Sequence, residues 1–451
     1  MDKGTHEGKR LSRRGVLTGA ATSAALPLLH IRTAGAAGKL WLGFTDSFVP
    51  VNNVVTRRQV EAWARKNAVD VHIDFIPTVG NKLLLTGSAE ALAKTGHDMY
   101  TFYSWDLYNA HASLAHVDDV MEPLIQAYGP VDQTAEYLAK VDGHWTAVPN
   151  SGSQLKPPCA RISWFKKHGL DLQAMYPARA EHTTLQDAWD YDALLKYAEL
   201  AAQDGVAFGL GLGGSNNTDG IEQVGAMFHA FGAGLIDRRG NILVDSPQMQ
   251  ECLQYAAKLV KFLPNEAASY DDASNNRALI SGKSALIFNA PSAWWVAKRD
   301  APAIADDCWT FSAPRGAKGR FVPSEAFFWG IWSFSRNQSA AKELLSHLMQ
   351  RSLVEERINA VQGYNIPPFA GLSDFPIWET AGPPPGTLFN YPIRPWHKAE
   401  PSLPGSEASP EIAAQIYASA IHTGMLARLK SGSTIKQVIA WAREQLTGLV
   451  Q

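Results

Sequence analysis

The chain has 451 residues, 46% of them hydrophobic, which is enough for two or three domains with full-sized cores. Its formal net charge of −2 gives no overall basic excess, which argues against a nucleic-acid partner and against a membrane-surface protein. Cys159, Cys252 and Cys308 are widely spaced and allow at most one disulfide, so we expect buried thiols.

Residues 1–36 have the features of a twin-arginine export signal. Residues 12–18 (SRRGVLT) carry the two arginines, and a weakly apolar stretch continues to residue 29. Arg32 precedes Ala34-Gly35-Ala36, whose small side chains suit signal peptidase. The apolar stretch is shorter than the ~20 residues of a membrane span, although an uncut N-terminal anchor is the alternative. We therefore expect removal of this segment and, without a nearby cysteine for lipid attachment, a soluble periplasmic protein.

The mature chain opens with alternating strand and helix patterns. Residues 39–45 (KLWLGFT) are an apolar run typical of a buried strand, and residues 53–66 have helical spacing of apolar side chains. Residues 69–76 alternate as a strand, residues 81–94 predict a helix, and residues 97–102 predict a third strand. This order favours a mostly parallel sheet with right-handed crossovers.

A similar α/β pattern continues along the chain. Asp245-Ser246-Pro247 predicts a helix start with proline at the first helical position. The expected later strands are residues 145–149, 206–212, 285–288 and 326–334. The expected later helices are residues 187–203, 220–231, 247–262, 339–349 and 353–361, with two more within residues 409–446.

Several blocks in this order resemble the family 1 extracellular solute-binding proteins, the maltose-binding-like group that serves ABC importers. Residues 92–99 (LAKTGHDM) are similar to the helix end before the family's third strand, with His97 where proline is usual. The other similar blocks are residues 141–149 (VDGHWTAVP), 281–288 (SGKSALIF), 311–316 (FSAPRG) and 338–349. The resemblance covers residues 40–446.

The resemblance implies a two-lobed periplasmic binding protein fold of the α/β class, in which each lobe is a mostly parallel sheet flanked by helices. The three crossings between lobes are expected near residues 148–153, 311–314 and 363–367. Lobe I then comprises residues 37–149 plus 314–364, and lobe II comprises residues 150–313 plus 365–451. The resemblance also implies a small-molecule ligand captured by hinge closure, an ABC permease of the inner membrane as partner, and a monomer.

Ligands of open α/β sheets bind at the carboxyl ends of the strands, so the residues that follow each strand are candidate ligand contacts. Carboxylates and amides hydrogen-bond to vicinal hydroxyls, and aromatic rings stack on sugar rings, which points to a carbohydrate or polyol. The 14 tryptophans favour the same interpretation. The predicted ligand-binding residues are Asp46, Ser47, Trp105, Asn109, Asn150, Asn216, Trp294, Glu325, Tyr364, Arg394 and Trp396.

Simpler structural roles are open for several of these residues. Trp105 suits packing beneath the helix that it starts, and Asn216 suits a helix cap. Arg394 suits a structural ion pair. Trp294 is preferred to its neighbour Trp295, because adjacent residues of a helix face different ways.

No motif predicts a cofactor, a metal site or a catalytic site. His111 with His116, and Glu343 with His347, lack the further ligands of a zinc site, and the G-x-G-x-x-G match at residues 209–214 does not begin a dinucleotide-binding unit. We therefore expect a binding protein and no enzyme. The alternatives are a periplasmic carbohydrate-active hydrolase that pairs Glu325 with Asp46, and a ligand-sensing receptor subunit.

Overall fold

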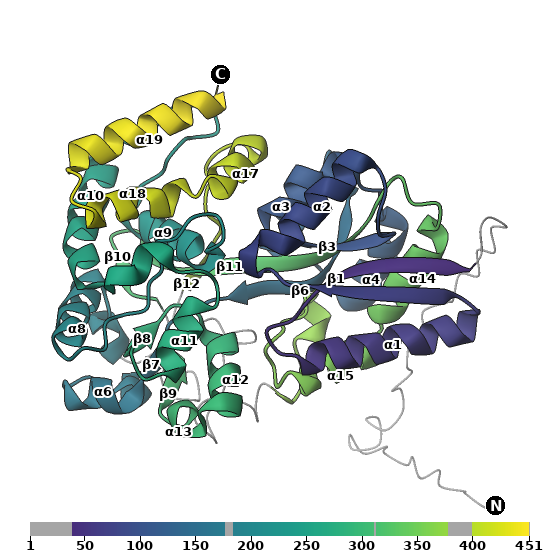
Figure 1. Cartoon of the computed structure of the whole chain (residues 1–451), viewed down its shortest axis with the longest axis horizontal. Helices are drawn as coiled ribbons and strands as arrows, with labels where there is room; N and C mark the ends of the chain where they lie inside the picture. The colour runs from purple at the N-terminus through teal and green to yellow at the C-terminus, as the bar shows by residue number, and fades with distance from the viewer. Residues whose placement is uncertain (1–37, 176–183, 311–312, 378–398, 451) are drawn as a thin grey trace, which may run out of the picture. The chain divides into compact units, whose positions relative to one another are not determined.

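The computed structural model describes residues 38–175, 184–310, 313–377 and 399–450 (Figure 1). The expected export signal at residues 1–36 lies outside the described residues. Within the described ranges, no helix is both long enough and apolar enough to cross a membrane.

The first elements alternate as predicted. They are β1 (Lys39–Thr45), α1 (Val51–Asn67), β2 (Asp70–Ile76), α2 (Lys82–Ala93) and β3 (Met99–Tyr103). β1 lies between β2 and β3 and runs parallel to both, with Leu42 paired to Ile73 on one side and to Met99 on the other. Leu42 and Met99 are fully buried, so this parallel part of the sheet is apolar at its centre.

The main sheet has seven strands, and the other members come from later in the chain. They are β6 (Ala147–Leu155), β10 (Arg315–Gly316), β11 (Gly319–Ile331) and β12 (Ala399–Ser402). The second half of β11 is antiparallel to both β3 and β6, and its first half up to Pro323 pairs with β10 and β12. β11 therefore links the N-terminal strands to strands that belong to later parts of the chain (Figure 1).

A separate sheet contains β7 (Cys159–Arg161), β8 (Leu286–Ile287) and β9 (Cys308–Thr310), with β7 in the middle. Both pairings are antiparallel, so the expectation of a mostly parallel sheet in each lobe is wrong for these strands. The two neighbours of β7 come from residues 286–310, far from β7 along the chain.

The strand expected at residues 206–212 does not form. Within this segment Gly209 makes a single parallel bridge, to Ile287. A Cβ added at Gly209 would lie 2.8 Å from the Ile287 side chain, so glycine is needed for the close approach. Alternate glycines also give a strand few side chains to pack, which explains why the pairing stops after one bridge.

The remaining helices surround these sheets. Before β6 they are α3 (Trp105–Ala110), α4 (Asp118–Tyr128) and α5 (Gln133–Ala139). The next are α6 (Ile162–Lys167), α7 (Leu172–Met175), α8 (Tyr191–Gln203), α9 (Thr218–Phe231), α10 (Pro247–Leu259), α11 (Ser274–Ile280), α12 (Ala290–Asp300) and α13 (Pro302–Ala305). The last are α14 (Gln338–Leu348), α15 (Arg351–Ala360), α17 (Pro410–Ala418), α18 (Ile421–Lys430) and α19 (Ile435–Val450).

Two helix boundaries show how local sequence determines where helices begin and end. The Ser246 hydroxyl accepts a hydrogen bond from the Met249 N–H at 3.2 Å, and Pro247 is the first helical residue of α10, as predicted. At the C-terminal end three helices form where two were expected. Ala420 adopts a left-handed conformation, φ 50°, and separates α17 from α18.

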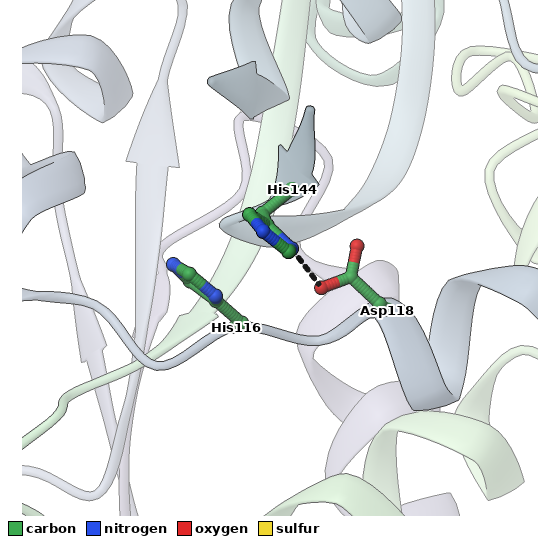
Figure 2. A group of neighbouring side chains, drawn as sticks. All are labelled: His116, Asp118 and His144. Carbon is green, nitrogen blue, oxygen red and sulfur yellow. Dashed lines mark hydrogen bonds and ion pairs between the residues drawn. The ribbon is translucent and has the colours of Figure 1, made fainter. Parts of the chain in front are cut away.

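A short hairpin brings together residues that are distant in the sequence. β4 (Lys140–Val141) and β5 (His144–Trp145) are joined by Asp142 and Gly143, both with positive φ. The hairpin places His144 beside Asp118, the first residue of α4, and His116 lies next to both (Figure 2). The fold thus brings to His116 two neighbours with potential ligand atoms, Asp118 and His144, that sequence analysis did not consider.

Cys159, Cys252 and Cys308 are all buried and free, which confirms the expectation of buried thiols.

Candidate functional site

A pocket with an empty volume of about 780 Å³ lies between the N-terminal strands and later elements of the fold. We call it the central pocket. Its aromatic lining consists of Phe48, Tyr103, Phe327, Tyr364 and Tyr417. Its charged lining consists of Asp106, Lys156, Asp219, Asp272 and Glu325. The pocket therefore offers both flat apolar surface and hydrogen-bonding groups.

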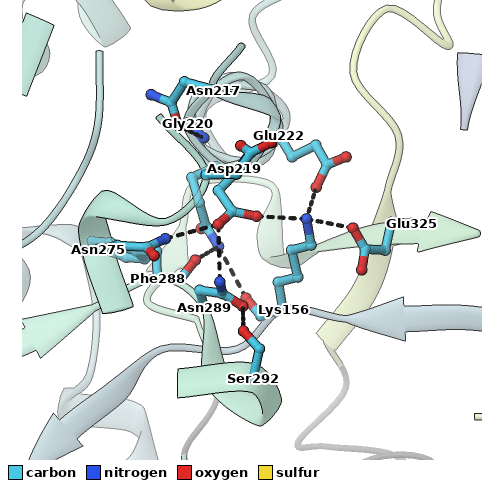
Figure 3. A network of polar contacts seen from close by, with 12 residues as sticks. Lys156, Asn217, Asp219, Gly220, Glu222, Asn275, Phe288, Asn289, Ser292 and Glu325 are labelled. Carbon is cyan, nitrogen blue, oxygen red and sulfur yellow. Dashed lines mark hydrogen bonds and ion pairs between the residues drawn. The ribbon is translucent and has the colours of Figure 1, made fainter. Parts of the chain in front are cut away.

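Lys156 lies at the centre of the polar lining, directly after β6, and its side chain is only 6% exposed. Its Nζ lies 2.7 Å from Asp219 Oδ1, 2.8 Å from Glu222 Oε2 and 2.5 Å from Glu325 Oε2 (Figure 3). Nζ also donates a hydrogen bond to the Tyr103 hydroxyl at 3.1 Å. We call these five residues the Lys156 cluster. An ammonium removed from water needs such compensation, because an unpaired buried charge is costly.

Helix α9 supplies two of the carboxylates because of its cap and its periodicity. The Asn217 side chain accepts a hydrogen bond from the Gly220 N–H at 3.1 Å and so starts the helix. Asp219 and Glu222 are three residues apart and share a face of the helix, which is turned toward Lys156.

Asp219 is held from both ends of its carboxylate. Oδ1 contacts Lys156, while Oδ2 accepts hydrogen bonds from the amides of Asn275 at 2.8 Å and Asn289 at 2.9 Å (Figure 3). The hydroxyl of Ser292 donates in turn to Asn289 Oδ1 at 3.0 Å. These contacts fix the orientation of polar groups along the wall of the central pocket.

Burial shifts the protonation of the Lys156 cluster. Burial lowers the pKa of Lys156, but Asp219, Glu222 and Glu325 together raise it well above its usual value. Burial also raises the pKa of Glu222 and Glu325, against the opposing effect of Lys156. The Tyr103 hydroxyl donates to Glu222 Oε1 at 2.6 Å and makes a short contact with Glu325. Lys156 therefore stays charged, and the surplus of carboxyl groups favours a proton held among the acids.

Asp106 lies on the wall of the central pocket outside the Lys156 cluster. Burial raises the pKa of its carboxyl to about 7. Its neighbour Trp105 is fully buried, and the Trp105 Nε1 donates to the Pro404 carbonyl at 2.9 Å. Adjacent positions of α3 therefore face opposite environments, the core and the pocket.

An adjoining pocket of about 670 Å³ shares Phe48, Thr78, Phe327 and Tyr364 with the central pocket. Of the predicted ligand-binding residues, Asp46, Ser47 and Asn150 line the adjoining pocket, Glu325 lines the central pocket, and Tyr364 lines both. Of these five, Asp46 and Ser47 directly follow the strand β1, whereas Asn150 and Glu325 lie within β6 and β11.

The other predicted residues lie elsewhere. Asn109 lines a third pocket, of about 820 Å³, which shares Tyr103 and Asp106 with the central pocket. Trp105 and Trp294 are buried and are not among the residues that line the three pockets. Asn216 is exposed outside those linings, and its neighbour Asn217 is the helix cap. Arg394 and Trp396 lie outside the described residues.

Sequence analysis missed most of the polar lining, including Lys156, Asp219, Asp272 and Asn289. The strand predicted at residues 145–149 extends in fact to Leu155, so the residue after the strand end is Lys156. Asp219 precedes the predicted helix start by one residue. A more accurate strand boundary would have identified Lys156 by the strand-end rule, whereas Asp219 lies inside α9 and follows no strand.

Comparisons with known proteins agree with this architecture. Residues 71–383 match the family described as "Bacterial extracellular solute-binding protein". A Thermotoga maritima structure with maltose bound is 17% identical, covers 92% of this chain and 100% of its own, and gives a TM-score of 0.74. A sugar transporter structure from Arthrobacter chlorophenolicus with bound laminaribiose is 17% identical. The match covers 91% of this chain and 99% of the transporter chain, with a TM-score of 0.71.

A third structure, described as a chitin oligosaccharide binding protein, is 14% identical, covers 92% of this chain and 100% of its own, and gives a TM-score of 0.72. No curated protein matches the chain. At such low identity the structural similarities show the fold, which is the predicted two-lobed α/β fold.

Proposed function

Because the chain belongs to the bacterial extracellular solute-binding protein family, we propose that it is the periplasmic solute-binding component of an ABC importer. It acts as a monomer that captures a small ligand and delivers it to a permease in the inner membrane. The observation that carries this proposal is the central pocket, whose walls come from the N-terminal strands on one side and from α9 and α17 on the other.

The ligand that this pocket fits is a carbohydrate or a polyol. Phe48, Phe327 and Tyr364 line both adjoining pockets and offer flat apolar surface for the C–H faces of sugar rings. Asp106, Asn289 and the other polar residues supply hydrogen bonds to hydroxyls. The similar structures with maltose and laminaribiose support this ligand class.

We infer capture by hinge closure, with residues 37–149 plus 314–364 as one lobe and residues 150–313 plus 365–451 as the other. β6 and β11 pair along their lengths near the boundaries of these segments, which suits strands that bend together. The Asn81 amide donates to the Ser215 hydroxyl at 3.1 Å, and both residues line the central pocket from opposite segments. A ligand that touches both walls shifts the population toward the closed state.

Export is proposed to use the twin-arginine route, with removal of residues 1–36. The arginine pair at residues 13 and 14 and the small residues before position 37 support this route. Catalysis is not part of the proposal. Glu325, the carboxylate that a hydrolase would use, is paired with Lys156 and Tyr103, and its expected partner Asp46 lines the adjoining pocket.

A ligand screen tests the proposal. The purified protein is melted with maltose, laminaribiose, chitin oligosaccharides and a set of polyols, and small-angle scattering is recorded with each member that stabilises it. We expect a rise in melting temperature with at least one saccharide or polyol, together with a smaller radius of gyration. Stabilisation without compaction contradicts hinge closure, and no stabilisation by the whole panel contradicts the ligand class.

A further inference from the structure

His116, Asp118 and His144 converge on the surface at the start of α4 (Figure 2). One ligand atom from each residue, an imidazole nitrogen or a carboxylate oxygen, lies within 4.8 Å of those of the other two. The two imidazole rings are stacked, with centroids 4.5 Å apart and planes inclined by 13°. We call these three residues the His116 cluster, and none of them is among the residues that line the three pockets above.

Backbone hydrogen bonds hold the two sides of this cluster together. The Val117 N–H donates to the Trp145 carbonyl at 2.8 Å, so the residue after His116 is tied to the residue after His144. The turn at Asp142 and Gly143 has positive φ at both residues and closes the hairpin directly before His144. The two histidines therefore project from a braced backbone rather than from loose loops.

Asp118 is oriented by a separate contact. Its Oδ1 accepts a hydrogen bond from the Trp145 N–H at 2.9 Å, which leaves Oδ2 toward His144 Nδ1, 3.1 Å away. A hydrogen bond from the backbone to a carboxylate oxygen holds the carboxylate in one orientation, as is common for carboxylates that bind metals. The adjacent Asp119 binds Lys342 at 2.8 Å, so this lysine neutralises Asp119 and not Asp118.

Two imidazoles and one carboxylate are a ligand set that suits zinc, with water in the fourth tetrahedral position. Ligand atoms around a tetrahedral zinc ion lie roughly 3.3 Å apart, given zinc–ligand bonds of about 2.0 Å. Because the two rings are stacked nearly parallel, their nitrogen lone pairs do not point at one ion, so binding requires at least one imidazole to turn about its side-chain torsions. His116 and His144 are exposed, so no packed neighbour opposes such rotations.

We propose that His116, Asp118 and His144 form a surface site for a divalent transition-metal ion, with zinc as the best fit. The site is separate from the ligand pockets and does not rest on the proposed function. Its open fourth position faces solvent, so the ion exchanges freely with the medium and does not act as a buried structural metal.

Zinc titration of the untagged full chain tests the proposal. A fluorescent zinc chelator competes for the ion at pH 7.5, and His116→Ala, His144→Ala and Asp118→Asn are compared with wild type. We expect one zinc site in the wild type, weakened at least tenfold by each histidine substitution. His168→Ala is the matched control, because His168 also contacts an aspartate, Asp204, at 2.9 Å but has Lys167 beside it in place of a second histidine.

Cobalt provides a second readout that does not depend on stability. The wild type loaded with Co²⁺ is expected to show visible absorption typical of tetrahedral coordination, and the His116→Ala and His144→Ala variants are expected to lose it while keeping the wild-type circular dichroism. Absence of zinc binding by the wild type overturns the proposal. It is also overturned if zinc binding survives both histidine substitutions or falls equally in His168→Ala.

Discussion

The Lys156 cluster and the His116 cluster both gather charged or ionisable side chains from distant parts of the chain, but they differ in exposure. The Lys156 side chain is 6% exposed and the Glu222 side chain is fully buried, whereas His116 and His144 are exposed. In the buried cluster each charge depends on the others, because water cannot replace a lost partner. In the exposed cluster water compensates each group, so the side chains remain available for a new ligand.

The largest expected effect comes from removing the buried cation. Lys156→Met leaves three buried carboxyl groups without their counter-charge, and we expect the free energy of unfolding to fall by about 3–5 kcal/mol. Urea denaturation at pH 7.5, followed by tryptophan fluorescence, measures the change. Lys342→Met is the control, since it removes a partly exposed lysine paired with the exposed Asp119 and should cost less than about 1 kcal/mol. Equal losses of unfolding free energy in the two variants would contradict the claim that the buried charges of the Lys156 cluster depend on one another more than exposed charges do.

An effect of opposite sign is expected at Asp106, which shares the pocket but stands outside the Lys156 cluster. Its pKa is raised to about 7 in the folded chain, so ionisation of Asp106 costs folding free energy as pH rises from about 4 to about 7. Asp106→Asn removes this cost. We expect the variant to match the wild type at pH 4 and to be more stable at pH 8 by up to about 4 kcal/mol, since a pKa difference of one unit corresponds to about 1.4 kcal/mol.

Thermal and urea unfolding at the two pH values measure the Asp106 effect. A stability difference that does not grow with pH would contradict the raised pKa of Asp106.

The smallest expected effect on stability is at the His116 cluster. His144→Ala breaks an exposed contact with Asp118, and we expect the free energy of unfolding to change by less than about 0.5 kcal/mol. Urea denaturation without added metal measures this change. A loss of several kcal/mol would mean that the exposed cluster is a structural element after all, comparable to the Lys156 cluster.

The regular part of the fold was predictable because its sequence periodicity is strong. β1 begins and ends where the apolar run at residues 39–45 predicts, and α1, β2 and α2 follow within a few residues of their predicted positions. The strand predicted at residues 206–212 was wrong. This apolar run resembles a strand in sequence, but its glycines weaken strand pairing, and only Gly209 forms a bridge.

The candidate site was predictable only in part. The strand-end rule found Asp46 and Ser47, which follow β1, whereas Glu325 lies inside β11 and Tyr364 follows the helix α15. It did not distinguish Trp105 from Asp106, since one residue along a helix turns the side chain by about 100° and tertiary packing decides which residue faces the core. Tryptophan content was a poor guide for the same reason, as Trp105 and Trp294 are buried.

Ligand binding by the central pocket is tested most directly with a matched pair of phenylalanines. Phe327 in β11 lines both adjoining pockets and packs 4.9 Å from the Tyr103 ring, whereas Phe334, shortly after β11, stacks on Trp332 outside the pocket linings. Both side chains are partly buried. Substitution of either one by alanine therefore removes a similar amount of packed surface.

Calorimetric titration of the saccharide or polyol that stabilises the wild type most is the decisive measurement. We expect Phe327→Ala to weaken binding about tenfold or more, which is about 1.4 kcal/mol, and Phe334→Ala to stay within about twofold of the wild type. Equal affinities for the two variants, or a larger loss in Phe334→Ala, would contradict the assignment of the central pocket as the ligand site.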